Sequence, residues 1–139
     1  MNNTKVFYYC ARLVDLGNKL IQERLQALGA DGLVPSHGDI LMKLFHQGEG
    51  STMGEIASAI HRTRPTVTVL ISKLNAKGYV KLVPDTADGR QMRVYLTDKG
   101  QALKPSFDEI STALYKLIHT KLNDEELAFL EHLLKKILE

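Results

Sequence analysis

The 139-residue chain has a single cysteine, Cys10, and no apolar run that approaches the length of a membrane-spanning helix. A lone cysteine excludes an internal disulfide framework and a cysteine-rich zinc site. Without a long apolar run, no segment is expected to cross a membrane. Residues 1–5 lead into an amphipathic stretch and not into the apolar block of a signal peptide. We therefore expect a cytoplasmic protein without a membrane partner.

Catalytic and metal-binding signatures are also missing from the sequence. There is no glycine-rich phosphate loop, and no nucleophile, base and orienting acid form a local motif. No two of the five histidines lie four residues apart, as a histidine pair on one helix would need to do to share a metal. We expect no enzyme activity, no cofactor and no metal site. An enzyme would need a cofactor or metal pocket that the sequence does not display.

Acidic residues are absent from residues 56–84, a segment that contains five basic residues, Arg62, Arg64, Lys73, Lys77 and Lys81. Residues 51–100 carry eight basic and four acidic side chains, although the formal net charge of the chain is only +2. The phosphate backbone of DNA attracts a folded surface whose charges are all positive. The middle of the chain is therefore the candidate DNA surface, and its slightly acidic flanks are candidates for protein contacts.

Apolar periodicity predicts two helices in the first third of the chain. The first covers residues 5–28, where apolar groups return every three or four positions, and Gly29 fits its C-terminal cap. The second begins at the polar residues 36–39 and ends near Gly48.

Two short helices follow, each opened by a threonine. Thr52 and Glu55 form a capping-box pattern, in which each side chain satisfies a free backbone amide of the other residue. Thr63 caps the next helix, which tolerates Pro65 in its first turn and ends before Gly78. The pair reads as a helix-turn-helix.

The second half of the chain contains a hairpin and two more helices. Residues 79–83 and 92–96 are β-rich runs joined by a polar turn. Thr97 caps a fifth helix that bends at Pro105, and Asn123 begins the last helix. The expected fold is mainly α with a small β-hairpin, in the order α-α-α-α-β-β-α-α.

The fourth helix has two different faces when its residues are projected at the helical angle. Its inward stripe consists of Val67, Leu70, Ile71 and Leu74. Its outward face is small and uncharged at the centre, with Pro65, Val69, Ser72 and Ala76 flanked by Thr66, Thr68 and Lys73. Such a face lets the helix backbone approach the floor of a major groove. The alternative is an ordinary amphipathic surface helix, but an outward valine and the missing acids argue against it.

The hairpin extends this surface, because its loop carries Arg90 while Lys81 and Arg93 lie on its arms. An arginine beside a recognition helix can enter a narrow minor groove. Asp88 either holds that arginine or only forms the turn. The residues that we predict to contact DNA are Arg62, Thr63, Arg64, Pro65, Thr66, Thr68, Val69, Ser72, Lys73, Lys81, Asp88, Arg90 and Arg93.

Nearly the whole chain resembles the multiple-antibiotic-resistance regulator (MarR) family of winged-helix transcription factors. The most specific blocks are residues 63–68, 74–80, 85–90 and 96–100, at consistent spacing. The resemblance implies a single 1–139 domain with a winged helix-turn-helix lobe at 36–96. It also implies a homodimer, held by helices in 1–28 and 97–139, on a palindromic operator. Members of this family are often released from DNA by a small aromatic or anionic ligand, by oxidation or by a metal. From the resemblance we expect a small-molecule ligand to release this chain.

Dimerisation is also expected from the residues themselves. The first helix and the last two carry more apolar surface than a monomer of this length covers, and a two-fold partner would bury it. The predicted interface residues are Val6, Cys10, Leu13, Phe107, Leu114, Leu127, Leu130, Leu134 and Ile137. The alternative is that these helices pack only on their own lobe.

Cys10 follows Tyr8 and Tyr9 and is the candidate for redox sensing. The hydroperoxide-sensing branch of the family has a cysteine in a similar place. Cys10 also falls in the apolar stripe of its helix, which favours a buried, inert thiol. The sequence therefore indicates a DNA-binding regulator, a repressor by our expectation. Redox sensing and a protein-binding winged helix without DNA binding remain as alternatives.

Overall fold

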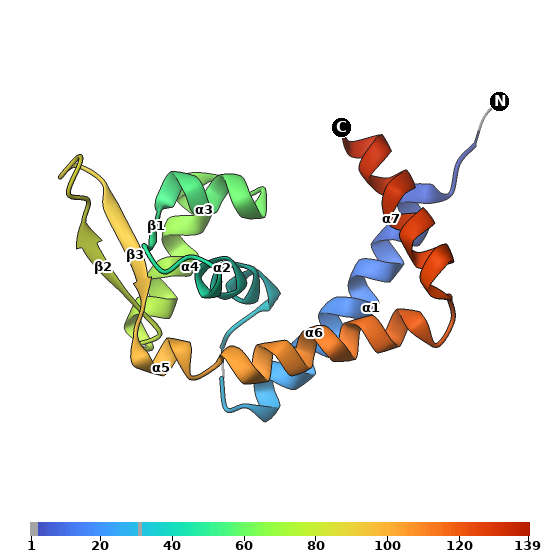
Figure 1. Ribbon diagram of the computed structural model, residues 1–139, viewed down its shortest axis with the longest axis horizontal. Coiled ribbons are helices and arrows are strands. Elements are labelled where there is room, and N and C mark those ends of the chain that lie inside the picture. Colours follow the sequence, from blue (N-terminus) through green and yellow to red (C-terminus); the bar gives the residue numbers. More distant parts are fainter. Residues whose placement is uncertain (1–2, 31) are drawn as a thin grey trace. The chain divides into compact units, whose positions relative to one another are not determined.

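The structure is a computed structural model that describes residues 3–30 and 32–139. The order of its elements is α1 (Val6–Ala27), α2 (Pro35–Phe45), β1 (Ser51–Thr52), α3 (Met53–Ile60), α4 (Arg64–Ala76), β2 (Val80–Pro84), β3 (Met92–Leu96), α5 (Asp98–Gln101), α6 (Lys104–His119) and α7 (Asp124–Leu138) (Figure 1). The chain forms two compact units, Met1–Phe107 and Asp108–Glu139, and the boundary falls inside α6. The mainly helical fold with a small sheet is confirmed.

The sheet has three antiparallel strands and not the two of the expected hairpin. β2 pairs with β3 from Val80↔Leu96 to Pro84↔Met92, and β1 pairs with the other side of β3 through Ser51↔Val94 and Thr52↔Arg93. The strand order is β1-β3-β2. A two-residue strand shows no alternation of polar and apolar residues, so the sequence pattern could not reveal β1.

The expected fifth helix is two helices. Thr97 accepts a hydrogen bond from the Gly100 amide at 3.1 Å, as its predicted capping role requires. α5 then ends at Gln101 and α6 begins at Lys104, so the bend predicted at Pro105 is a break. Pro105 is the second residue of α6, where the missing amide costs no helical hydrogen bond.

Three predicted helix starts are confirmed by their hydrogen bonds. The Thr52 hydroxyl accepts from the Glu55 amide at 3.2 Å, and the Thr63 hydroxyl accepts from the Thr66 amide at 3.4 Å. Asn123 and Glu126 form a reciprocal capping box at the start of α7. Each threonine cap satisfies one of the free amides of a first helical turn.

The predicted start of the second helix is wrong. α2 begins at Pro35, and its N-cap is Val34, whose amide donates to Nδ1 of His37 at 2.9 Å. The His37 side chain is 3% exposed, and its Nε2 has no hydrogen-bond partner among the described residues. Because Nδ1 accepts a hydrogen bond, His37 is the neutral tautomer that carries its proton on Nε2.

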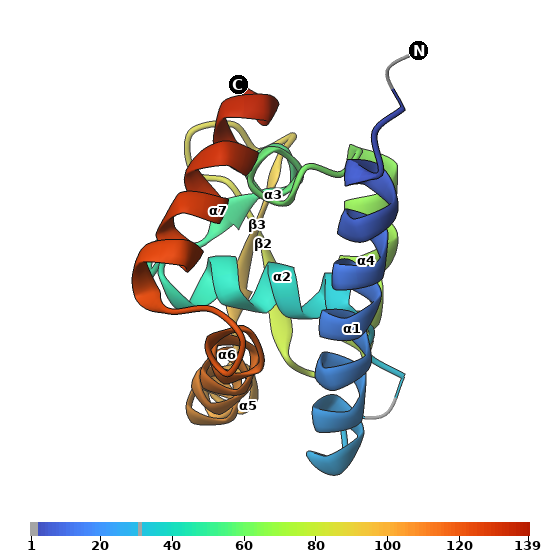
Figure 2. The same cartoon turned by 90° about the vertical axis from the view of Figure 1, so that its right-hand side faces the viewer.

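The core of the first unit lies where α2, α3 and α4 meet the sheet. In Figure 2, α1 runs from the N-terminal end of the chain to the loop that leads into α2. The residues of this unit with relative exposures of 1% or less are Leu25, Leu33, Ile40, Leu41, Ser51, Ile56, Val67, Ile71, Leu74, Val80 and Val94. Apart from Leu33, which precedes α2, they come from α1 and from α2, α3, α4 and the three strands, so one core holds the lobe together. Among the described residues, no helix is long and apolar enough to cross a membrane.

Gly100 of α5 lies very close to the backbone of Tyr79, the residue before β2. A Cβ added there would collide with the carbonyl oxygen of Tyr79, which already accepts the Thr97 amide at 3.1 Å. We expect Gly100→Ala to lower the free energy of unfolding by about 2 kcal/mol, because backbone on both sides must shift. Urea unfolding measures the change. Gly48→Ala is the control, since nothing lies within 4 Å of a Cβ there. Equal stability of the two variants would contradict this packing.

His37 makes stability depend on pH. Burial lowers its pKa from 6.5, and the positive charges of Lys73 and Lys77 lower it further. A folded-state pKa below the unfolded value means that the stability contribution is complete above pH 6.5 and is lost as the pH falls through the lowered pKa. In His37→Gln, the amide oxygen can accept the Val34 amide without titrating. Urea unfolding at several pH values should therefore show a smaller loss of stability in acid for the variant. An unchanged pH dependence would exclude His37 as the cause.

Candidate nucleic-acid interface

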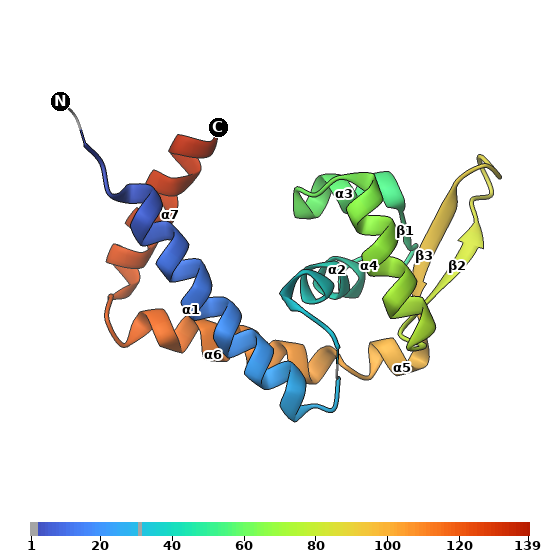
Figure 3. The same ribbon diagram turned by 180° about the vertical axis from the view of Figure 1, so that it is seen from behind.

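α3 and α4 form a helix-turn-helix with the β2–β3 hairpin beside α4 (Figure 3). The turn covers residues 61–63, and His61 takes the left-handed conformation there, with φ of 56°. Its backbone ends α3 and redirects the chain so that Thr63 can cap α4. α4 is therefore a separate helix at the surface of the lobe. Helices that read a DNA groove have this arrangement.

The inner face of α4 is buried, apart from the half-buried Leu70, and its outer face is open, as predicted. Val67, Ile71 and Leu74 have relative exposures of 0%, 1% and 0%, whereas Val69 is 71% exposed. The other outward residues predicted to contact DNA are also exposed, namely Pro65, Thr66, Thr68 and Ser72. A neutral surface of small side chains therefore lies along the helix.

Two hydroxyl groups of this face, those of Thr68 and Ser72, already donate their protons within the helix. The Thr68 hydroxyl donates to the Arg64 carbonyl at 2.9 Å, and the Ser72 hydroxyl donates to the Thr68 carbonyl at 2.8 Å. A hydroxyl has one proton and two lone pairs, so in these rotamers Thr68 and Ser72 offer acceptors to a partner. The acceptors suit the amino groups of adenine and cytosine in a major groove. The sequence showed that hydroxyl groups lie on this face, but not that they are free to act as acceptors only.

Basic side chains frame the neutral face. Arg62, Arg64, Lys73 and Lys81 are all exposed. A Cβ at Gly54 would collide with the guanidinium group of Arg64, so this side chain leans over the first turn of α3. Arg64 also borders a shallow cavity of about 210 Å³ whose walls are Met53, Gly54, Arg64, Arg90, Gln91 and Met92. The N-terminal end of α4 and the hairpin loop thus share one basic recess.

At the hairpin loop, Arg90 has 92% of its side chain exposed. Its Nε and its backbone amide each donate to Oδ1 of Asp88 at 3.1 Å. The side-chain hydrogen bond from Arg90 is the largest of the effects that lower the pKa of Asp88. Both roles considered for Asp88 therefore apply, since it forms the turn and also orients the arginine.

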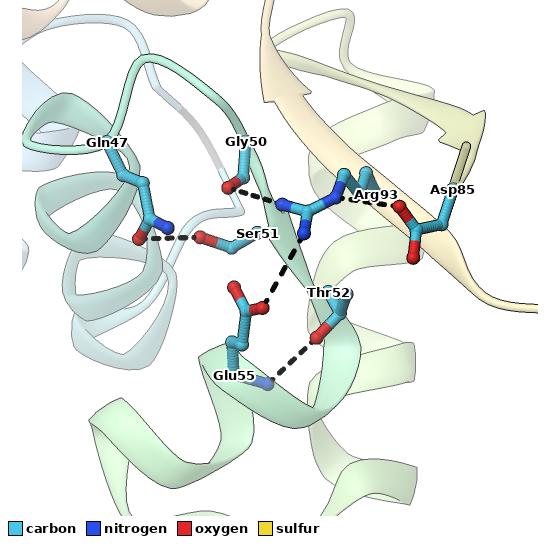
Figure 4. Close-up of polar contacts among 7 residues, drawn as sticks. All are labelled: Gln47, Gly50, Ser51, Thr52, Glu55, Asp85 and Arg93. Atoms are coloured by element: carbon cyan, nitrogen blue, oxygen red, sulfur yellow. Dashed lines mark hydrogen bonds and ion pairs between the residues drawn. The ribbon is translucent and has the colours of Figure 1, made fainter. Parts of the chain in front are cut away.

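Arg93 is placed differently from the other predicted DNA contacts. Its side chain is only 26% exposed, and its guanidinium nitrogens face acceptors of the protein, namely Asp85, the Gly50 carbonyl and Glu55 (Figure 4). The hydrogen bond to Asp85 is the first cause of a raised pKa of Arg93. Hydrogen bonds to Asp85 and Gly50 take two of its five N–H donors, so a DNA contact would have to come from the remaining donors of a mostly covered side chain. The predicted capping box is also half complete, because the Glu55 carboxylate faces Arg93.

Apart from Phe107, the residues predicted for a dimer interface are either exposed or half-buried. In α1 only Leu25 is buried, while Val6 and Leu13 are 44% and 39% exposed. In α7 no residue is buried, and Ile137 is 66% exposed. The half-buried members of the predicted set are Cys10, Leu114, Leu127, Leu130 and Leu134. The aromatic residues Phe7 and Phe129, which are not in the predicted set, are 81% and 63% exposed.

Phe107 was wrongly predicted for the dimer interface. It is 3% exposed, and its ring packs edge-on against Phe45 of α2 with 5.6 Å between centroids. The break before Pro105 starts a new helix, and this changes the direction in which residue 107 points. A continuous helix was assumed when the interface was predicted.

Within the described part of the chain, no assembled site for redox sensing or for metal sensing is present. Cys10 is half-buried on α1, so redox sensing stays a prediction. Among residues 3–30 and 32–139, no three histidine, cysteine, aspartate or glutamate side chains gather as metal ligands would.

Comparisons with known proteins find winged-helix regulators. A model of the MarR family matches residues 31–91. The chain is 34% identical over 94 residues to the HTH-type transcriptional regulator TtmR of Methylorubrum extorquens, which covers 68% of this chain and 47% of that protein. It is 29% identical over 92 residues to the transcriptional activatory protein BadR of Rhodopseudomonas palustris, covering 65% and 53%. The chain spans about half the length of the curated relatives it matches.

A solved structure agrees over nearly the whole fold. The crystal structure of the S. aureus MepR–DNA complex superimposes with a TM-score of 0.87 at 25% identity, and 98% of each chain is covered. The helix-turn-helix, the hairpin and the flanking helices therefore have counterparts in a protein solved with DNA.

Proposed function

The chain belongs to the MarR family of winged-helix transcriptional regulators, and we propose that it is a sequence-specific DNA-binding repressor that acts as a homodimer. The observation that carries this proposal is the outer face of α4. It combines the exposed Val69 with outward hydroxyl acceptors and no acidic side chain. A solvated helix face normally mixes charges of both signs, whereas a groove-reading face needs small neutral groups and flanking cations.

Each part of the lobe has a distinct role in the proposed complex. α4 enters the major groove, where Val69 can meet a thymine methyl group and Thr68 and Ser72 accept from base amino groups. Arg62, Arg64, Lys73 and Lys81 neutralise phosphates. Arg90 enters the adjacent minor groove, where a narrow A/T-rich segment has the strongest negative potential.

A second copy of the chain is the proposed partner of α1 and α7. Both helices expose large apolar side chains, and α7 has no buried residue at all. Two lobes related by a two-fold axis would read a palindromic operator, with half-sites about 34 Å apart on one face of the duplex. The dimer would be a repressor when its operator overlaps a promoter. BadR is named as activatory, so a promoter fusion with and without the protein must establish the sign of regulation.

Release by a small aromatic or anionic ligand would follow from the same geometry. Two lobes must lie one helical turn apart to bind both half-sites. A ligand that binds better to a dimer with another lobe spacing lowers DNA affinity by its difference in binding free energy between the two states. A screen of aromatic acids for loss of operator binding tests this part of the proposal, and the absence of any effect across the screen would count against it.

DNA binding should depend strongly on salt. The logarithm of the affinity for a palindromic duplex should fall linearly with the logarithm of salt concentration, with a slope of about −0.9 for each phosphate neutralised. Fluorescence anisotropy at several salt concentrations gives the slope. A weak association that does not respond to salt would instead support a winged helix that binds protein.

Arg90→Ala should weaken binding by about ten-fold at operators with an A/T-rich minor groove beside the half-site. The loss should be smaller when that segment is replaced by G/C pairs, because the wider groove attracts arginine less. Lys121→Ala is the matched control, since Lys121 is also an exposed cation but lies outside the lobe. An equal loss on both duplexes would make Arg90 an ordinary phosphate contact.

Ile137→Asp should raise the dimer dissociation constant at least ten-fold, because a carboxylate would be buried in an apolar interface. Ile137 is 66% exposed within the chain, so the substitution removes little packing from the monomer. Sedimentation velocity measures the change, with Glu131→Gln on the same helix as the control. A variant that remains dimeric at the wild-type concentration would remove Ile137 from the interface.

A further inference from the structure

Arg93 occupies the centre of the small sheet. It lies in β3, the middle strand, opposite Thr52 of β1 on one side and Val83 of β2 on the other. From this position its side chain reaches residues next to both neighbouring strands and the first turn of α3 (Figure 4). It therefore joins the β2–β3 hairpin to residues 50–55, which lie far from it in the sequence.

All three nitrogens of the Arg93 guanidinium group face an acceptor of the protein. Nε donates to Oδ1 of Asp85 at 3.0 Å, and Nη1 donates to the Gly50 carbonyl at 3.1 Å. Nη2 lies 3.8 Å from Oε1 of Glu55. The side chain of Asp85 is only 10% exposed, so water screens this ion pair less than it screens a surface pair. A planar fork that meets several acceptors is the arrangement that arginine forms and lysine cannot.

Asp85 connects this network to the loop that carries Arg90. It follows Pro84 at the end of β2, and its amide donates to the Gln91 carbonyl at 2.8 Å. The loop over residues 85–91 is thus closed at its base by a main-chain hydrogen bond and by the side chain of Asp85. The strand pairing ends at Pro84 and Met92, so it does not fix the direction of this loop.

We propose that Arg93 is a positioning residue, which acts through Asp85 to fix the direction in which the hairpin loop carries Arg90, and that it makes no DNA contact itself. The proposal rests on the proposed DNA-binding function and assigns Arg93 a different role from the other basic residues of the lobe.

The two possible roles of Arg93 predict opposite effects for Asp85→Asn. If Arg93 and its neighbours acted only through charge, removal of a carboxylate near DNA would leave binding unchanged or strengthen it, because repulsion of phosphate falls. If Arg93 positions the loop, loss of the Asp85 charge weakens the same link that loss of Arg93 removes, because a neutral amide oxygen holds a guanidinium group less strongly than a carboxylate does. Asp85→Asn should then weaken binding in spite of its more favourable charge.

The DNA-binding experiment compares Asp85→Asn, Arg93→Met and Arg93→Lys with the control Glu49→Gln, which removes an exposed acidic charge near the same sheet. All three test variants should bind an A/T-rich operator about three- to ten-fold more weakly, with the salt slope of the wild type. In an Arg90→Ala background the losses should largely disappear, because the residue being positioned is gone. Glu49→Gln should bind as well as the wild type or better.

A direct phosphate contact gives a different set of results, and these would overturn the proposal. Asp85→Asn would bind as tightly as the wild type or more tightly, and Arg93→Met would reduce the magnitude of the salt slope by about one. Arg93→Lys would keep most of the affinity, and the effects of Arg93→Met and Arg90→Ala would add.

Amide hydrogen exchange tests the same link without DNA. The Asp85 amide should exchange faster in Arg93→Met and Asp85→Asn than in the wild type, while the Val94 amide in the centre of the sheet should not change. A protected Val94 amide also shows that the variants are folded. Unchanged exchange at Asp85 would overturn the positioning role. If the wild type does not bind DNA, the proposed function fails, and the exchange result still decides whether Arg93 holds the loop.

Discussion

Burial of Val67, Ile71 and Leu74 is the interaction on which the candidate DNA surface depends. Each of these side chains is at most 1% exposed, and burial of each contributes about 1.5–3 kcal/mol. Because successive residues of a helix advance by about 100°, fixing this stripe also fixes which residues point outward. Val69 and the hydroxyls of Thr68 and Ser72 face away from the protein for that reason. The core thus determines the chemistry that α4 offers, and the basic residues only frame it.

The hairpin is oriented by polar contacts more than by packing. Its two long strands are paired along their length, but the loop beyond them has Arg93 and Asp85 at its base and Asp88 against Arg90 at its tip. In this arrangement one arginine is held inside the protein while another is left open to solvent. Their roles differ because their surroundings differ, although both are basic residues of the same hairpin.

Local patterns predicted most of the fold, and long-range contacts account for most of the errors. Thr63 as a cap and the stripe that contains Val67 follow from residues within one or two helical turns. The sequence could not show that Arg93 is held by acceptors of the protein, because its partner Gly50 lies 43 positions away, where no periodicity indicates it. Phe107 was placed in the interface because the break before Pro105 changes the phase of the helix, and the sequence gives no measure of that change.

The central claim is that the outer face of α4 meets the major groove of DNA while its inner stripe stays in the core. Methyl spectra of selectively labelled valines on addition of a palindromic duplex test this most directly, because Val69 and Val67 lie on opposite faces of one helix. The account predicts a large shift of the Val69 methyl signals and little change at Val67. Saturating DNA binding that leaves the Val69 signals in place would contradict it.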